Sequence, residues 1–182
     1  NSNNEFIYSL GLGEPIFDTP KPIVDATIKA LHDGLTKYSN PAGLIELRTL
    51  IRNKLLKDNG IHTEIDNIVV TPGTKQGLQI ALMALLKPGD EVINHTPSYI
   101  SYIPQVKIAE PQATIVNVNL NKDDFSINIE ALEVAITQKT KVIILNSPHN
   151  PTGKIISAKE IDQIACLIKG KPIYILSDEI YE

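Results

Sequence analysis

The chain has 182 residues, of which 42% are apolar and 21% charged, an ordinary globular composition that excludes a collagen, a coiled coil and a wholly disordered protein. Its 17 basic and 21 acidic residues give a net charge of −4, and they form no basic run, so nucleic acid and anionic membranes are disfavoured as partners. The single cysteine, Cys166, cannot form an internal disulfide, and no apolar stretch is long enough to cross a bilayer, so we expect a cytoplasmic protein.

Two helices are expected before residue 61. Thr19 can cap a helix that begins at Pro20, and Gly34 is expected to end it. Leucines and isoleucines at helical spacing predict a second helix, which begins near Gly43 and ends at Asn59-Gly60.

From residue 67 onward, short apolar strands alternate with helices. The expected strands are 67–71, 91–94, 113–118, 141–145 and 173–176, and the expected helices are 74–86, 98–108, 128–136 and 157–168. This alternation is typical of an α/β layer with a mostly parallel sheet. Ligands of such sheets bind beyond the carboxyl ends of the strands, so functional residues are sought just after Val70, Asn94, Leu145 and Leu176.

The first of these positions carries a glycine turn that leads directly into a helix. Gly73 permits a tight turn, and the free N–H groups and dipole of the helix that follows would attract a phosphate. The hydroxyl of Thr74 and the ammonium of Lys75 could add to this attraction. Taken alone, an ordinary strand-to-helix turn explains the segment better, and the Walker pattern is absent.

The second position carries two tyrosines. Tyr99 follows a strand end, where its ring can lie against a flat heteroaromatic ligand. A half-buried core tyrosine would read the same way in the sequence, and for Tyr102 this is the preferred interpretation.

The third position is the loop Asn146–Gly153, in which two prolines enforce an extended and rigid backbone. Asn150 can donate a hydrogen bond to a phenolate-like oxygen. His149 has no second histidine at ligand spacing, so we expect no metal site there.

The fourth position carries two adjacent acids. A carboxylate at the end of a buried strand needs a partner, which could be a metal, an arginine or a protonated ring nitrogen. Neighbouring residues of an extended chain point in opposite directions, so Asp178 is expected to face inward and Glu179 to be structural.

A phosphate seat, a stacking ring, a donor for a phenolic oxygen and an anion for a ring nitrogen together match pyridoxal 5'-phosphate. The chain resembles the N-terminal half of a class I/II, fold-type I aminotransferase. The resemblance rests on stretches in the family's order along the chain, at 11–15, 38–43, 146–153 and 177–181.

This resemblance implies a fold and a division of the chain. The fold is the three-layer α/β/α large domain, truncated before its last strands and before the C-terminal small domain. Residues 1–34 would contribute to the small domain and the substrate side, and residues 35–182 would form part of the cofactor-binding large domain. A homodimer is implied, as are cis peptides before Pro97 and Pro151.

The resemblance also assigns roles to single residues. Gly73, Thr74 and Lys75 would hold the cofactor phosphate, and Tyr99 would stack on the ring. Asn150 and Tyr181 would bind the phenolic oxygen, and Asp178 would pair with the ring nitrogen. Gly13, with Asn150, would contact the substrate, while Tyr38 would reach the cofactor of the neighbouring subunit.

The implied reaction transfers an amino group from an L-amino acid to a 2-oxo acid. The family's Schiff-base lysine and its substrate-binding arginine lie downstream of residue 182, so we expect an N-terminal fragment that is inactive alone. A β-lyase of the same fold and a non-catalytic cofactor-binding module remain alternatives. A dinucleotide oxidoreductase is a poor candidate, because Gly11 and Gly13 are not followed by the third glycine of its motif.

Overall fold

The computed structural model describes Gly11 and residues 13–182. The start of the expected segment 1–34, namely residues 1–10 and 12, lies outside the described residues. The elements in chain order are α1 (Lys21–His32), α2 (Ile45–Asn59), the short 3-10 helix η1 (Ile65–Asn67), α3 (Thr74–Leu85), β1 (Glu91–Thr96), α4 (Tyr102–Ala109), β2 (Thr114–Asn119), α5 (Ile129–Ala135), β3 (Thr140–Asn146), α6 (Ala158–Ile168) and β4 (Tyr174–Asp178).

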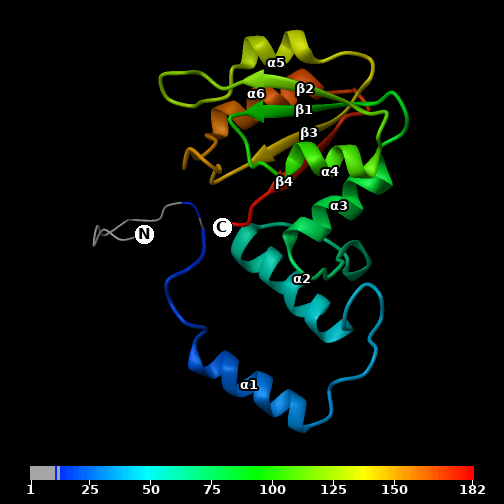
Figure 1. Ribbon diagram of the computed structural model, residues 1–182, viewed down its shortest axis with the longest axis vertical. Coiled ribbons are helices and arrows are strands. Elements are labelled where there is room, and N and C mark those ends of the chain that lie inside the picture. Colours follow the sequence, from blue (N-terminus) through cyan, green and yellow to red (C-terminus); the bar gives the residue numbers. More distant parts are fainter. Residues whose placement is uncertain (1–10, 12) are drawn as a thin grey trace, which may run out of the picture.

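The described strands form one parallel sheet in the order β2-β1-β3-β4. Helices α3 and α4 cover one face and α5 and α6 cover the other, which gives three layers (Figure 1). The predicted α/β/α fold with a parallel sheet is therefore confirmed. Because the described strands all run the same way, their carboxyl ends lie along one edge of the sheet.

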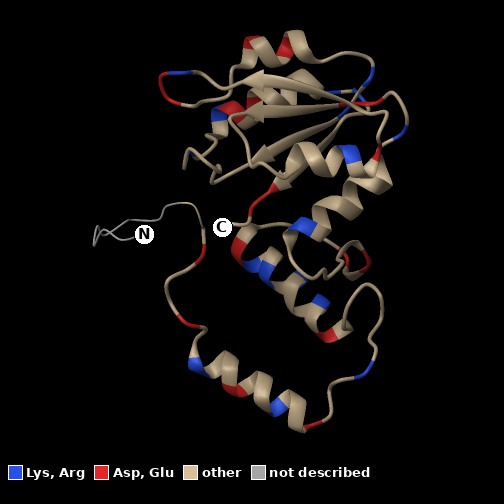
Figure 2. Ribbon diagram, viewed as in Figure 1, with Lys and Arg blue, Asp and Glu red and all other residues tan. Residues whose placement is uncertain are grey.

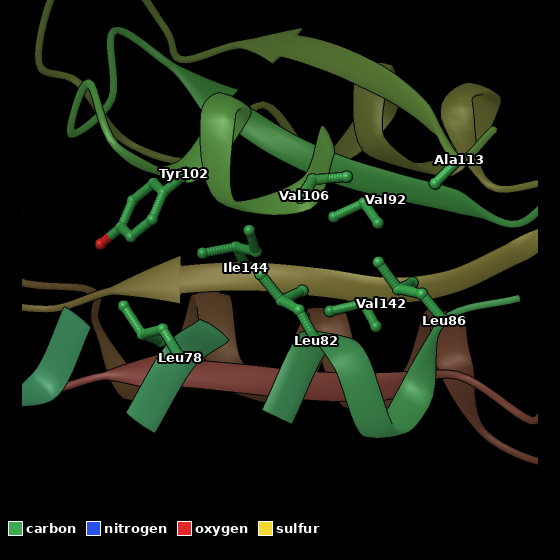
Figure 3. Packing of buried hydrophobic residues seen from close by; sticks show 9 residues of the cluster. All are labelled: Leu78, Leu82, Leu86, Val92, Tyr102, Val106, Ala113, Val142 and Ile144. Atoms are coloured by element: carbon green, nitrogen blue, oxygen red, sulfur yellow. The ribbon is translucent and has the colours of Figure 1, made fainter. Parts of the chain in front are cut away.

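Each face of the sheet has its own apolar core. Val92 and Val142 pack with Leu82 of α3 and Val106 of α4 (Figure 3). The residues next to them in the strands point to the other face, where a second core forms under α5 and α6 from Ile93, Val118, Ile143, Leu132 and Ile164. A strand buried on both faces needs apolar residues at successive positions, which explains the pair Val92-Ile93 in β1 and the apolar run 142–145 in β3.

Side-chain caps fix the starts of two helices on the second face. The Asn128 side chain accepts a hydrogen bond from the Ala131 N–H at the start of α5. Ser157 and Glu160 form a reciprocal capping box at the start of α6. The predicted cap at Thr19 is wrong: α1 begins at Lys21 after Pro20, without a side-chain cap.

The expected strand at 67–71 is also wrong. Only the end of η1 and irregular backbone occupy this segment, and the Val70 N–H donates to the Ala42 carbonyl. A strand requires a neighbouring strand to complete its hydrogen bonds, and among the described residues none lies beside this one. Val69 is 58% exposed, which shows that its apolar side chain lacks a covering layer here.

Helix α1 lies apart from the sheet, beyond α2 (Figure 1). None of its residues is buried, and its apolar side chains Ile23, Val24, Ile28 and Leu31 are exposed. This separation agrees with the proposed boundary near residue 34, although the division into 1–34 and 35–182 stays a prediction.

Charged residues of both signs are interspersed over the described helices and loops (Figure 2). Helix α2 carries Glu46, Arg48, Lys57 and Asp58, for example. None of the helices in the described part of the chain is long and apolar enough to span a membrane.

Candidate active site

A cavity of about 590 Å³ lies where α3 begins and where β3 and β4 end. Its volume falls within the range of about 300–1,000 Å³ that small-molecule sites occupy. Residues from five separate predicted motifs line this cavity: Gly13, Thr74, Lys75, Tyr99, Asn150, Asp178 and Tyr181.

The first turn of α3 forms one end of the cavity. Gly73 precedes the helix with φ +88°, a conformation that side chains disfavour, and no side chain of the described residues caps the helix. The first N–H groups of a helix have no partner within it, and the first turn of α3 contains no acidic residue. The Lys75 ammonium lies 5.8 Å from the centre of the Tyr99 ring. This end of the cavity is therefore suited to an anion.

The buried carboxylate of Asp178 lines the same cavity. Asp178 is 5% exposed at the end of β4. The Tyr102 hydroxyl donates to its Oδ2 at 2.7 Å, and the Ile180 N–H donates to its Oδ1 at 3.3 Å. Among the described residues, no lysine, arginine or histidine forms an ion pair with it. Glu179 is exposed instead and accepts a hydrogen bond from Ser177.

The third feature is an amide-phenol pair. The Asn150 Nδ2 donates to the Tyr181 hydroxyl at 3.2 Å. Asn146 holds the two segments that carry this pair, because its Nδ2 donates to the Asp178 carbonyl at 2.8 Å and its Oδ1 accepts from the Asn150 N–H at 2.7 Å. The two side chains predicted to bind one phenolic oxygen thus lie next to each other.

The wall between these features contains two aromatic rings. Tyr99 and Tyr102 meet edge to face, with ring centres 5.4 Å apart and planes at 82°. Tyr102 is buried, as expected of a core tyrosine, but its hydroxyl contact with Asp178 was not predicted. The spacing of the two tyrosines was visible in the sequence, whereas the contact joins residues 76 positions apart.

Three other residues that the sequence singled out do not line this cavity. Gly73 precedes the helix and does not itself line the cavity. Tyr38 is fully exposed and also lies outside the cavity lining, so its predicted role in a neighbouring subunit stays a prediction. His149 is buried, which lowers the pKa of its ring, and its Nδ1 pairs with the Thr152 hydroxyl at 2.8 Å.

The backbone of the loops around the cavity contains cis peptides at both expected positions, Thr96-Pro97 and Asn150-Pro151, and at Ser147-Pro148, where none was expected. Within Gly11 and residues 13–182, no group of three His, Cys, Asp or Glu side chains is arranged to hold a metal.

Known proteins are similar to this chain in sequence and in fold. The model of the family "Aminotransferase class I and II" matches residues 7–182. The chain belongs to this aminotransferase family. A probable aspartate aminotransferase of Methanocaldococcus jannaschii is 42% identical to it over 174 residues, which are 96% of this chain and 46% of that protein. A probable aspartate/prephenate aminotransferase of Rickettsia prowazekii is 42% identical over 97% of the chain and 44% of its own length.

Solved aminotransferase structures agree with this assignment. Aspartate aminotransferase from Thermus thermophilus with maleate superposes with a TM-score of 0.90 at 39% identity, over 94% of this chain and 44% of that one. An aromatic aminotransferase from Pyrococcus horikoshii gives a TM-score of 0.90 at 40% identity, over 94% of this chain and 46% of that one. This chain therefore spans less than half the length of these relatives.

Members of this aminotransferase family use pyridoxal 5'-phosphate, and the residues present fit that cofactor. A flat ring with a phosphate arm needs an anion seat and an aromatic wall, and the cavity has both in α3 and Tyr99. Asp178, a buried carboxylate with no cationic partner in the described part of the chain, suits a protonated ring nitrogen. The pair of Asn150 and Tyr181 offers hydrogen bonds for a phenolic oxygen.

Proposed function

We propose that this chain forms the cofactor-binding part of an aminotransferase, which moves an amino group from an L-amino acid to a 2-oxo acid. One observation carries the proposal. The buried carboxylate of Asp178, which has no cationic partner among the described residues, lines the same cavity as the open end of α3. A ligand with an anionic group and a protonated ring nitrogen satisfies both ends at once.

In this proposal, each residue has a separate task. Bound pyridoxal phosphate supplies an electron sink for the breaking of the substrate Cα–H bond. Asp178 keeps the proton on the ring nitrogen, and each unit by which it raises the pKa of that nitrogen corresponds to about 1.4 kcal/mol. Thr74 and Lys75, with Gly73 before them, hold the phosphate, and Tyr99 packs against the ring.

Asn150 and Tyr181 orient the ring through its phenolic oxygen, and their mutual hydrogen bond supports this role. Gly13 lines the cavity and offers its backbone to the substrate carboxylate. Because the compared proteins include aspartate aminotransferases, L-aspartate is the first amino donor to assay.

The whole protein is proposed to be a homodimer in which Tyr38 reaches the partner's cofactor, which is supported by the complete exposure of Tyr38. Its Schiff-base lysine and its substrate-binding arginine are expected beyond residue 182. A cytoplasmic location is proposed from the single cysteine, which suits a reducing compartment.

Replacement of Asp178 by Ala in the whole protein tests the proposal. Exchange of the Cα–H of L-aspartate, followed by NMR in D₂O, should fall by at least about 100-fold, while binding of inorganic phosphate to the cofactor-free protein should be retained. Replacement of the adjacent, exposed Glu179 by Ala is the matched control and should leave exchange intact. Exchange at the original rate in Asp178→Ala would refute the assignment.

A further inference from the structure

Helix α4 carries two buried polar side chains that lie one turn apart. Tyr102 is 3% exposed and Gln105 is 4% exposed. Burial of a polar group is unfavourable unless the group finds a hydrogen-bond partner. Each of these side chains makes a short hydrogen bond to an element outside α4, so their partners indicate what the helix holds in place.

Both partners, Asp178 and Lys75, line the cavity. The Tyr102 hydroxyl donates to Asp178 Oδ2 at 2.7 Å, and the Gln105 Nε2 donates to the Lys75 carbonyl at 2.6 Å. Lys75 belongs to the first turn of α3, where an anion would bind. Residues at positions i and i+3 lie on the same face of a helix. One face of α4 therefore contacts both the anion seat and the carboxylate.

Helix α4 is firmly packed. Val106, on the same face, is buried in the core formed with α3, β1 and β3. Rigid elements hold a binding geometry more accurately than loops do. A fixed distance between the two contact points matters here because the proposed cofactor is a rigid ring, with its phosphate arm and its nitrogen at separate positions.

Tyr102 is suited to act as a permanent donor. A carboxylate can only accept hydrogen bonds, so the Tyr102 hydroxyl must donate. Burial, followed by the hydrogen bond to Asp178, raises the pKa of Tyr102 far above its usual value, so the hydroxyl keeps its proton. The ring also packs edge to face on Tyr99, and a phenylalanine at position 102 would preserve this contact.

We propose that Tyr102 and Gln105 are positioning residues, which fix the distance between the phosphate seat on α3 and the carboxylate of Asp178. Tyr102 acts through Asp178, and Gln105 acts through the first turn of α3. This inference rests on the proposed function and adds to it the residues that set the spacing of the site.

The two ends of the site can be probed separately in the cofactor-free whole protein. Inorganic phosphate reports only on the α3 end, whereas pyridoxamine 5'-phosphate reports on both ends and forms no covalent bond. Dissociation constants for both ligands are measured by calorimetry in Tyr102→Phe and in Gln105→Met, together with the thermal midpoint of each variant.

Tyr102→Phe should weaken pyridoxamine phosphate by about tenfold and leave phosphate unchanged within about twofold, because the lost bond is to the charged Asp178 rather than to the phosphate seat. Gln105→Met should weaken pyridoxamine phosphate by a larger factor than phosphate, because the seat then moves relative to Asp178 and only pyridoxamine phosphate contacts both. Equal weakening of both ligands in this variant would show a purely structural role. Tyr174→Phe is the control. Tyr174 lies on β4 outside the cavity lining, with the Lys141 ammonium of β3 over its ring, and this variant should keep both constants.

Equal weakening of both ligands in Tyr102→Phe, or no change in either, would overturn the inference, since a purely structural residue cannot separate the two ligands. The Gln105→Met result decides independently if Tyr102→Phe fails to fold. Failure of the unaltered protein to bind either ligand would instead refute the proposed function.

Discussion

Replacement of His95 by Phe should make the folded protein less sensitive to acid. His95 lies near the end of β1 and is 6% exposed, and neither of its ring nitrogens has a hydrogen-bond partner among the residues that the structure describes. Burial lowers the pKa of its ring from 6.5 to about 4, and nearby His149 contributes in the same direction. In the folded state the ring is therefore neutral over a pH range in which the unfolded chain binds a proton.

The size of the effect follows from this difference in pKa. The unfolded state binds more protons between pH 6.5 and about 4, so the free energy of unfolding falls as the pH drops through that window. The stability that the neutral His95 ring allows is fully present above pH 6.5 and is lost as the pH falls toward about 4. A difference of about 2.5 pKa units corresponds to about 3 kcal/mol in total, of which about 2 kcal/mol is lost between about pH 7 and about pH 4.5.

The assay is urea unfolding followed by circular dichroism at those two pH values. His95→Phe should show a loss of stability on acidification that is smaller by about 2 kcal/mol than that of the unaltered protein. The comparison is made within each variant, so a packing change from the larger ring cancels. His62→Phe, at an exposed position, is the control and should keep the original loss. An equal acid sensitivity in His95→Phe and the unaltered protein would show that His95 is not held neutral by burial.

Two further changes test the local structure around the sheet. Gly43→Ala should destabilise the protein by more than Gly60→Ala. Both glycines have positive φ, but only at Gly43 would the new methyl group meet a side chain, that of Val70 at 2.7 Å. Equal midpoints of the two variants in thermal unfolding would contradict this. Glu160→Gln should cost about 1–3 kcal/mol at neutral pH, because the Glu160 carboxylate accepts from the Ile127 N–H and from both the N–H and hydroxyl of Ser157. Burial raises the pKa of Glu160, but these hydrogen bonds outweigh it and lower the pKa overall. The difference in unfolding free energy between Glu160→Gln and the unaltered protein should therefore shrink as the pH falls through the folded-state pKa. A pH-independent difference in urea unfolding would argue against a charged Glu160.

The loops of the candidate site could be predicted because a parallel sheet brings them together by geometry alone. Once β1, β3 and β4 were expected as buried parallel strands, the residues after them had to share one edge. Asn150 and Asp178 therefore needed no distance information to be placed at one site. The layers of the fold could also be predicted, since Val92 and Ile93 must face opposite cores when a strand is apolar at successive positions.

The failures have a common physical origin in partners that the local sequence does not show. The segment 67–71 has the composition of a strand, but no strand lies beside it among the described residues. Helix α4 begins four residues later than expected, at Tyr102, because the segment after the cis Thr96-Pro97 bond forms a turn before the helix starts.

The same limit explains why the function of α4 was missed. A tyrosine and a phenylalanine at position 102 would give the same apolar pattern, the same helix and the same edge-to-face contact with Tyr99. They differ only in one hydroxyl, and that hydroxyl bonds to a residue 76 positions away. Sequence patterns identify groups that meet a ligand, because such groups gather in loops with recognisable composition. Groups that position those ligand-binding residues are buried in the core, where their polar atoms become visible only when the tertiary partners are known.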